Sequence, residues 1–171
     1  MPTCKPHPEI TLEFINSILK YDPETGIVDS LKKRVGRKPK DGLPGHVTPS
    51  GYRSINIAGT EIQLHNLIWF MQTGEWPERI VDHKDRIRLN NKWTNLRLAD
   101  DSESGANKSL LSNNKSGHPG IWWHKGARKW TGEIAFRKKK RYLGLFDSLE
   151  KAVAAAKRVR KEMHGEFAAN D

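Results

Sequence analysis

The chain has 171 residues, of which 30 are Lys or Arg and 20 are Asp or Glu, so its net charge is +10. This excess predicts an acidic partner such as a nucleic acid. The single cysteine, Cys4, excludes a disulfide framework and a Cys-rich zinc ribbon, and we expect no structural zinc. No apolar run approaches the ~20 residues of a membrane span and no signal peptide begins the chain, so we expect a soluble, intracellular protein.

The charge is unevenly distributed. Residues 112–171 contain 14 basic and 6 acidic residues, a net charge of +8, whereas residues 1–111 contain 16 and 14, a net charge of +2. We therefore expect the C-terminal third to supply most of the long-range attraction for phosphate.

The first elements along the chain are a helix and a turn. Thr11 is predicted to cap a helix that continues through Lys20, and residues 22–26 (Asp-Pro-Glu-Thr-Gly) form a turn that leads into the apolar residues 27–28. Residues 32–40 are rich in Lys and Arg. They form either a solvated surface loop or a loop that also contacts phosphate.

A hairpin and an apolar helix follow. Residues 51–57 and 61–64 are predicted strands joined by Ala-Gly-Thr, and they lead into a helix that begins near His65. For His65 we expect a supporting role, structural or in positioning DNA, rather than catalysis.

The sequence then sets out a compact polar motif. Asp82 and His83 end a short apolar run, a polar loop with two adjacent Asn residues follows, and Asn95 opens a second strand-like run twelve positions after His83. Residues 100–108 form a predicted helix with Asp100 as its N-cap.

This order resembles that of the HNH, or ββα-metal, endonucleases, in particular the phage and intron-encoded homing branch with its Asp-His, Asn-Leu-Arg and Asn-x-x-Asn blocks. The resemblance implies that His83 is the general base and Asp82 a metal ligand, and that Asn95 holds the loop and the imidazole by hydrogen bonds. A His can accept a proton near neutral pH, and a carboxylate suits Mg²⁺ or Mn²⁺.

One position departs from the family pattern. The related enzymes carry an Asn ligand to the metal on the final helix, and here the alignment places Ser104 there, with Asn107 in the second Asn position of the block. A Ser hydroxyl is shorter than an Asn amide and a poorer oxygen donor, so the ion would rest on Asp82, water and phosphate. Ser104 is either natural or an inactivating substitution.

Beyond a predicted linker at residues 109–117, a second pattern begins. Residues 120–124, 129–137 and 140–147 are predicted strands, and residues 149–164 form a long Ala-rich helix. Strand alternation places Trp123, Trp130 and other apolar side chains against this helix, and polar side chains on the opposite face.

Residues 114–168 resemble the plant ethylene-response-factor (Apetala-type) DNA-binding domain, which also occurs fused to phage HNH nucleases. The resemblance rests on Gly120-Ile121, Lys129-Trp130, Glu133-Ile134, Leu143-Gly144, Phe146-Asp147 and a helix that ends in residues 164–167. It implies that the polar sheet face enters the major groove of DNA. The expected DNA contacts are Trp122, His124, Lys129, Glu133, Arg137, Lys140, Arg141 and Tyr142. The plant domains carry Arg at the positions that Trp122, His124 and Ala135 hold here. The DNA sequence that the plant domains prefer is therefore not expected for this chain.

Together these patterns predict an α+β protein. We expect an HNH nuclease domain at residues 1–108 and a three-stranded antiparallel sheet plus one helix at residues 118–171, acting as a monomer or weak dimer on double-stranded DNA. The resemblance to the homing endonucleases implies cleavage with one Mg²⁺ or Mn²⁺ per site and one strand nicked per site, in the cytoplasm of a phage-infected bacterium. The alternative is a sequence-specific DNA-binding protein whose metal site Ser104 has disabled.

Overall fold

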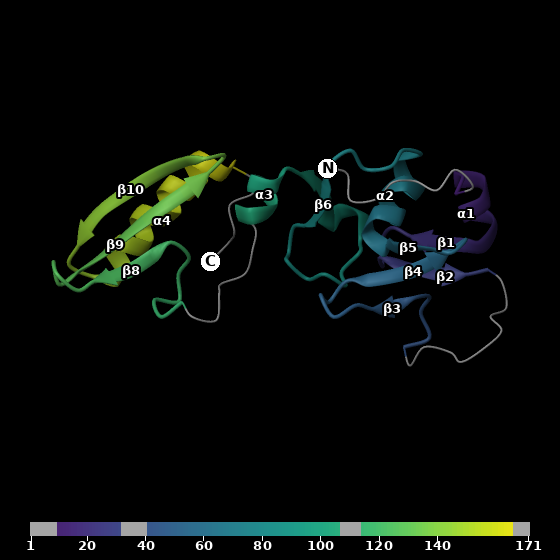
Figure 1. Ribbon diagram of the computed structural model, residues 1–171, viewed down its shortest axis with the longest axis horizontal. Coiled ribbons are helices and arrows are strands. Elements are labelled where there is room, and N and C mark those ends of the chain that lie inside the picture. The colour runs from purple at the N-terminus through teal and green to yellow at the C-terminus, as the bar shows by residue number, and fades with distance from the viewer. Residues whose placement is uncertain (1–9, 32–40, 107–113, 166–171) are drawn as a thin grey trace. The chain divides into compact units, whose positions relative to one another are not determined.

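The computed structural model describes residues 10–31, 41–106 and 114–165. Its contacts divide the chain into two compact units, Met1–Ala99 and Asp100–Asp171, which correspond to two groups of elements in Figure 1. The mixture of helices and small antiparallel sheets is the predicted α+β class. Among the described helices, none is both long and apolar enough to cross a membrane.

In its described residues, 10–31 and 41–99, the first unit contains seven strands in three small sheets, β1-β2, β3-β4-β5 and β6-β7. Its elements in chain order are α1 (Leu12–Ile18), β1 (Leu19–Asp22), β2 (Ile27–Ser30), β3 (His46–Val47), β4 (Arg53–Ile57), β5 (Thr60–Gln63), α2 (Leu64–Thr73), β6 (Ile80–His83), the 3₁₀ turn η1 (Trp93–Asn95) and β7 (Leu96–Ala99).

The predicted N-cap of α1 is confirmed, and the predicted end of that helix is wrong. The Thr11 side chain accepts a hydrogen bond from the Phe14 amide, but the helix stops at Ile18 instead of continuing through Lys20. Leu19 is extended and pairs with Ser30 across the β1-β2 hairpin. Cross-strand pairing therefore outweighs the apolar spacing that favoured a longer helix.

The hairpin before α2 is confirmed. Strands β4 and β5 pair from Ser54↔Gln63 to Ile57↔Thr60, and α2 follows directly. The fully buried side chains Ile15, Ile62, Leu67 and Ile68 join α1, β5 and α2 in one core. This core supports β6 through Val81 and β7 through Leu96. The basic run at residues 32–40 lies outside the described residues.

The polar motif forms a further hairpin, β6-β7. Asp82 pairs with Arg97 and His83 pairs with Leu96. The second strand begins at Leu96 rather than at Asn95, because Asn95 closes the 3₁₀ turn that precedes it.

The second unit begins with helix α3 (Asp101–Ala106). Its predicted cap is confirmed, since the Asp100 carboxylate accepts a hydrogen bond from the Glu103 amide at 2.8 Å. The Glu103 side chain in turn accepts one from the Asp100 amide at 2.7 Å, which completes a reciprocal capping pair.

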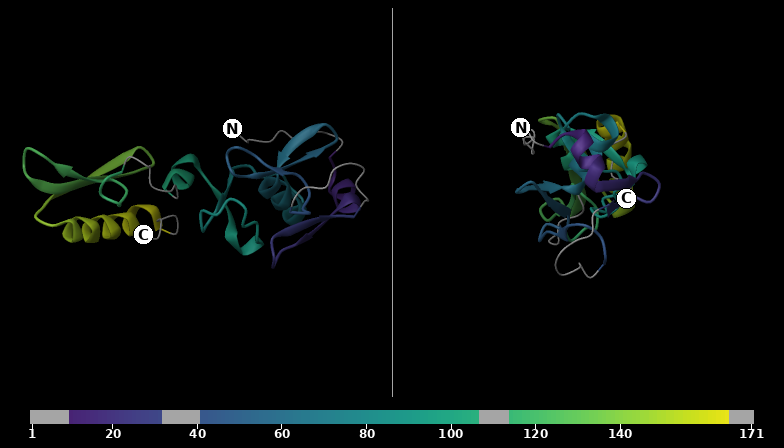
Figure 2. Two further views of the ribbon diagram at one scale, coloured as in Figure 1. Left: turned by 90° about the horizontal axis from the view of Figure 1, so that it is seen from below. Right: turned by 90° about the vertical axis from the view of Figure 1, so that its right-hand side faces the viewer.

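The predicted three strands and long helix of the second unit are also confirmed. Strands β8 (Ile121–His124), β9 (Lys129–Phe136) and β10 (Lys139–Phe146) form an antiparallel sheet in the order β10-β9-β8. Helix α4 (Leu149–His164) lies along one face of this sheet, as the left view of Figure 2 shows. The helix buries Ala152, Ala156 and Val159 against Ile121 and Ile134.

The β1-β2 hairpin contacts residues 91–93, where the β6-β7 loop ends. Tyr21 donates a hydrogen bond from its hydroxyl to the Asn91 carbonyl at 2.8 Å, and the Trp93 amide donates to the Pro23 carbonyl at 3.1 Å. Gly26, with φ of 75°, permits this approach, because a Cβ there would lie 2.5 Å from the Lys92 nitrogen. The turn therefore supports the segment that carries Asn91.

We predict that Gly26→Ala destabilises the protein more than Gly59→Ala. Both glycines have positive φ, which costs an L-residue about 1–2 kcal/mol, but a Cβ at Gly59 meets nothing within 4 Å. The contact with Lys92 should add about 1 kcal/mol or more. Urea unfolding of the two variants measures the difference, and equal losses of stability would show that the close approach at Gly26 carries no cost.

Candidate nuclease site

The His83 side chain is buried and held by one amide. Its exposed fraction is 3%, and its Nε2 lies 3.1 Å from the Asn91 Oδ1. The Asn91 side chain is oriented by a second contact, because its Nδ2 donates to the Leu89 carbonyl at 3.4 Å. An amide whose nitrogen is engaged in this way presents its oxygen to His83, and that oxygen can only accept.

This contact selects one tautomer of His83. The Asn91 oxygen requires a proton on Nε2, so in the neutral ring the lone pair lies on Nδ1. Nδ1 is then the nitrogen that can take a proton from water. The ring also needs to be neutral, and burial lowers the pKa of His83 more strongly than its hydrogen bond to the Asn91 oxygen raises it.

His65 packs against His83 from α2. The two ring centroids are 5.2 Å apart in an edge-on arrangement, and the Tyr52 ring lies 5.1 Å from that of His65. Burial, together with the neighbouring His83, lowers the pKa of His65 to about 3. A neutral ring of this kind supports His83 by packing, which agrees with the supporting role expected for His65.

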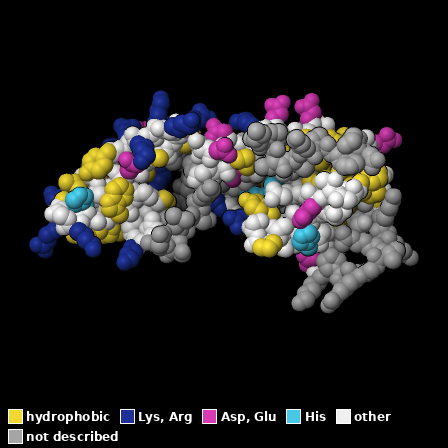
Figure 3. All heavy atoms as spheres, viewed as in Figure 1, with side chains coloured by type: hydrophobic (Ala, Val, Ile, Leu, Met, Phe, Trp, Pro, Cys, Tyr) yellow, Lys and Arg dark blue, Asp and Glu magenta, His cyan; other side chains and the backbone are white. Residues whose placement is uncertain are grey.

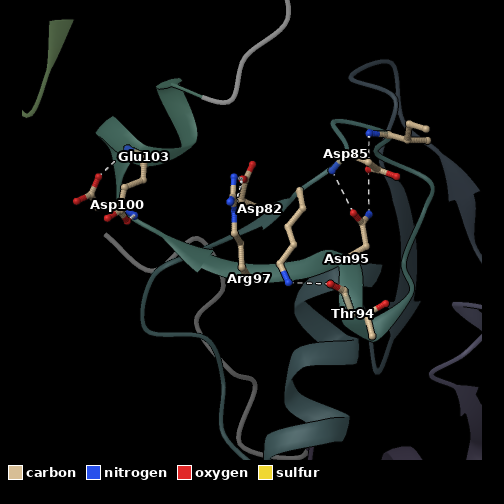
Figure 4. Close-up of polar contacts among 9 residues, drawn as sticks. Asp82, Asp85, Thr94, Asn95, Arg97, Asp100 and Glu103 are labelled. Carbon is tan, nitrogen blue, oxygen red and sulfur yellow. Dashed lines mark hydrogen bonds and ion pairs between the residues drawn. The ribbon is translucent and has the colours of Figure 1, made fainter. Parts of the chain in front are cut away.

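A polar network fixes the β6-β7 loop (residues 84–92). Asn95 donates to the Asp85 carboxylate at 2.9 Å and to the Asn90 carbonyl at 2.7 Å, and it accepts from the Asp85 amide at 3.1 Å. Figure 4 shows the Asn95 amide facing Asp85. Burial alone would raise the pKa of Asp85, but hydrogen bonds from Asn90, Ile87 and Asn95 together lower it. Asn95 thus holds the loop, as predicted, while the imidazole is held by Asn91 instead.

Asp82 faces a guanidinium rather than another carboxylate. The Arg97 Nε and terminal nitrogen lie 3.1 and 3.0 Å from the Asp82 Oδ2, and both side chains are nearly buried (Figure 4). Within the described part of the chain, no group of three or more His, Cys, Asp and Glu side chains is placed to hold a metal ion. A carboxylate oxygen is the donor type that a hard cation takes, so Asp82 fits that role chemically, in competition with Arg97.

Ser104 lies on α3 and is half-buried. Helix α3 belongs to the second unit, whereas Asp82 and His83 belong to the first. The role of Ser104 as a metal ligand therefore stays a prediction, and Asn107 lies outside the described residues.

The expected DNA-contact residues of the second unit fall mainly on the sheet face opposite α4. Trp122 pairs with Thr131, which pairs with Leu145, so these three side chains form one row across that face. Trp122 is 47% exposed and Tyr142 is 61% exposed. Lys129, on the same face, has a side-chain exposure of 44%, with its ammonium 3.0 Å from Asp147. His124 is also exposed, and its Nδ1 accepts the Ala127 amide in the β8-β9 turn.

The other basic members of the predicted set form ion pairs with carboxylates of the second unit. Lys140 pairs with Glu133 at 3.1 Å on the exposed face, and Arg137 pairs with Glu103 and with Asp100 near α3. Arg141 pairs with Glu162 of α4, which places it on the helix side of the sheet. In Figure 3, Lys and Arg side chains are spread over the visible face of this unit with hydrophobic side chains between them.

The prediction of core packing for Trp123 is wrong. Its side chain is 45% exposed, and its ring meets Trp130 edge-on at 5.3 Å. Strand β8 is the edge strand of the sheet, so a side chain on its helix-facing side can extend past the covering helix. Trp130 is half-buried and packs against the core.

Sequence reasoning missed two residues of the site. Asn91 was seen only as part of a polar loop, and its contact with His83 depends on the path of that loop. Arg97 lies in the Asn-Leu-Arg block, and its pairing with Asp82 follows from the strand register Asp82↔Arg97. A guanidinium two residues into the second strand was the available signal.

We predict that the first unit loses stability as the pH falls below about 6.5. Because the pKa of His65 is about 3 when folded, the unfolded chain binds the proton first, and stability should decrease by up to about 1.4 kcal/mol per pH unit. His65→Phe should flatten this dependence between pH 6.5 and 4.5. Urea unfolding at several pH values measures it, and an unchanged slope in the variant would contradict the role given to His65.

Comparison with known proteins supports the resemblance of the Asp82–Asn95 motif to the HNH endonucleases. Residues 63–106 match the family model described as HNH endonuclease. Protein 3.8 of Escherichia phage T7 is 35% identical over 105 residues, which cover 61% of this chain and 86% of the phage protein. The comparison with solved structures found no match. The chain therefore belongs to the family of Protein 3.8 of phage T7, and its residues 63–106 are an HNH endonuclease domain.

Proposed function

We propose that the protein is a metal-dependent, homing-type endonuclease that nicks one strand of double-stranded DNA per active site. The observation that carries this proposal is the neutral, buried His83, whose tautomer Asn91 selects, within an HNH endonuclease domain. An ordered base with its lone pair on a defined nitrogen is what activation of a water for phosphodiester hydrolysis requires.

In this mechanism the chain positions the base before DNA binds. His83 Nδ1 takes a proton from the attacking water, and the positive ring is stabilised by its contact with the Asn91 oxygen. Asn95 and Asp85 keep the loop in place during this step, which preserves the distance between base and phosphate. The Tyr52 and His65 rings pack against the His83 ring and help to hold its orientation.

By the resemblance to the HNH endonucleases, the metal would be held by Asp82, Ser104 and the DNA phosphate. When bound, Mg²⁺ or Mn²⁺ supplies a positive charge that stabilises the charge developing on the phosphate and the leaving oxygen. Arg97 neutralises Asp82 in the absence of the ion and would compete with it for the carboxylate. This competition, together with a hydroxyl at position 104, predicts weak metal affinity.

The second unit supplies DNA recognition in this proposal. Its ethylene-response-factor-like sheet presents Trp122, Tyr142 and Lys129 on the face away from α4, and residues 112–171 carry a net charge of +8. A cationic face with aromatic side chains suits contact with base edges and phosphates. One nuclease site per chain implies nicking by a monomer, and a double-strand break would need two chains or two successive events.

A second candidate function rests on the Asp82–Arg97 pair and on Ser104. If the metal cannot displace Arg97, the protein binds DNA without cleaving it. Supercoiled plasmid carrying a target site, incubated with Mg²⁺ or Mn²⁺ and compared with EDTA, separates the two. Relaxation that requires metal supports the nuclease, whereas tight binding without relaxation supports the DNA-binding protein.

We predict that His83→Ala reduces nicking by about 10²- to 10⁴-fold, because proton transfer contributes to the chemical step. DNA affinity should remain nearly unchanged, since His83 is buried and its proton transfer acts on the chemical step rather than on ground-state binding. Single-turnover nicking and a binding titration in EDTA measure the two effects. Nicking at the parental rate would exclude His83 as the base.

We predict that Ser104→Asn raises the nicking rate, most strongly at low Mg²⁺, because an amide oxygen is a better ligand than a hydroxyl. A titration of rate against Mg²⁺ concentration measures the change in apparent affinity. Asn107→Ala is the control and should have a smaller effect. If Ser104→Asn has no effect and Asn107→Ala abolishes nicking, Asn107 is the ligand instead.

A further inference from the structure

The β6-β7 loop presents two apolar side chains to solvent beside the candidate base. Ile87 is 59% exposed and Leu89 is 49% exposed. They alternate with Arg86 and Arg88 in the sequence Arg-Ile-Arg-Leu, which begins three residues after His83. Burying these side chains in the core would be favourable, so their exposure on an ordered loop indicates a partner.

The exposure is not a result of a loosely held loop. The Ile87 amide donates to the Asp85 carboxylate at 2.8 Å, and the Asn90 amide donates to the Ile87 carbonyl at 2.9 Å. Arg86 adopts a φ of 65°, a conformation that costs an L-residue about 1–2 kcal/mol. The loop therefore holds Ile87 and Leu89 outward at the expense of local backbone strain.

The charge of the loop identifies the chemistry of the partner. Four cationic residues, Lys84, Arg86, Arg88 and Lys92, stand against a single carboxylate, Asp85, whose oxygens already accept hydrogen bonds from Asn90 and Asn95. A surface that combines cations with two projecting aliphatic side chains suits duplex DNA, where cations contact phosphates and aliphatic groups enter between bases from the minor groove.

We propose that Ile87 and Leu89 form an apolar wedge that enters the minor groove and partly unstacks a base step next to the phosphate that is cut. This inference rests on the proposed function and deepens it, since it assigns the loop a role in placing the duplex on the site. The wedge is specific to deformable steps, because the cost of unstacking depends on the sequence. It would therefore contribute to the choice of cleavage position without hydrogen bonds to bases.

The wedge is connected directly to the base. The Leu89 carbonyl accepts from the Asn91 amide at 3.1 Å and from its side-chain nitrogen at 3.4 Å, and the same side chain holds His83. Arg88 is anchored on the other side, with its guanidinium 2.7 Å from the Ser50 carbonyl and 5.1 Å from the Tyr52 ring centre. Insertion of Leu89 would thus fix the duplex relative to His83 through one intervening residue.

The test uses the full chain and mixed-sequence duplexes that carry 2-aminopurine at successive positions, in EDTA so that no cleavage occurs. Fluorescence of this base rises when it is unstacked. We expect the wild type to raise it at one step, and the double variant Ile87→Ser with Leu89→Ser to abolish the rise and to weaken binding by about tenfold or more. The salt dependence of binding should remain, because the cations are unchanged.

Three controls make the result specific. Ile87→Leu with Leu89→Met keeps the apolar volume and should retain the fluorescence rise, which separates loss of the wedge from misfolding. Val47→Ser removes an apolar side chain of similar exposure on β3 and should have no effect. Lys92→Gln should reduce the slope of log affinity against log salt by about 1 while preserving the rise.

The outcomes distinguish the wedge from the proposed cleavage. Unstacking by the wild type that the double variant loses supports the wedge, even if no metal produces nicking. Metal-dependent nicking without any unstacking overturns the wedge and leaves the nuclease in place. Equal DNA affinity and fluorescence in the double variant and the wild type would also overturn it, and would point to a protein partner for this surface.

Discussion

The hydrogen bond between Asn91 and His83 is the interaction on which the candidate site depends. It fixes the orientation and tautomer of the only ring in the motif that can act as a base. Asn91 is itself held from two sides, by Tyr21 of the β1-β2 hairpin and by Leu89 of the loop. The position of Asn91, and with it the contact to His83, therefore depends on Tyr21, which lies seventy residues earlier in the chain.

Burial has two opposing effects at this site. It keeps His83 and His65 neutral, which a base needs, and it makes protonation of either ring costly to the fold. The same reasoning applies to Asp82, whose nearly buried carboxylate would be unfavourable without the Arg97 guanidinium. His83, Asp82 and Asp85 each have a specific partner, namely Asn91, Arg97 and Asn95. Catalysis would require a metal cation to displace Arg97 from the Asp82 carboxylate.

Local signals in the sequence were sufficient for most of the fold. Turn chemistry at residues 58–60 predicted the β4-β5 hairpin, whereas at residues 22–26 it predicted the turn but not the β1-β2 pairing. Asp100 predicted the start of α3, because a helix cap depends only on neighbouring residues. The end of α1 was not predictable in this way, since the pairing of Leu19 with Ser30 competes with the helix. The exposure of Trp123 likewise depends on its place at a sheet edge, which alternation does not reveal.

In the site, too, some features could be predicted from the sequence and others depend on contacts between distant residues. The resemblance to the HNH endonucleases pointed to His83 and Asn95 as candidate site residues. The imidazole is paired with Asn91 because of the path of the β6-β7 loop, which the motif does not specify. Asp82 is paired with Arg97 because of the register of the two strands, which the motif does not specify either. Ile87 and Leu89 gave no signal in the sequence, because apolar residues in a loop usually turn inward, and only the structure shows that they do not.

The central claim is that His83 is a neutral base with its lone pair on Nδ1. Nitrogen NMR of the imidazole, with the protein labelled at histidine, reports the tautomer and the protonation state directly. The account predicts a neutral ring that carries its proton on Nε2 at neutral pH, a pKa below the ordinary value of a His, and a mixture of tautomers in Asn91→Leu. A proton on Nδ1, or a positively charged ring at neutral pH, would contradict it.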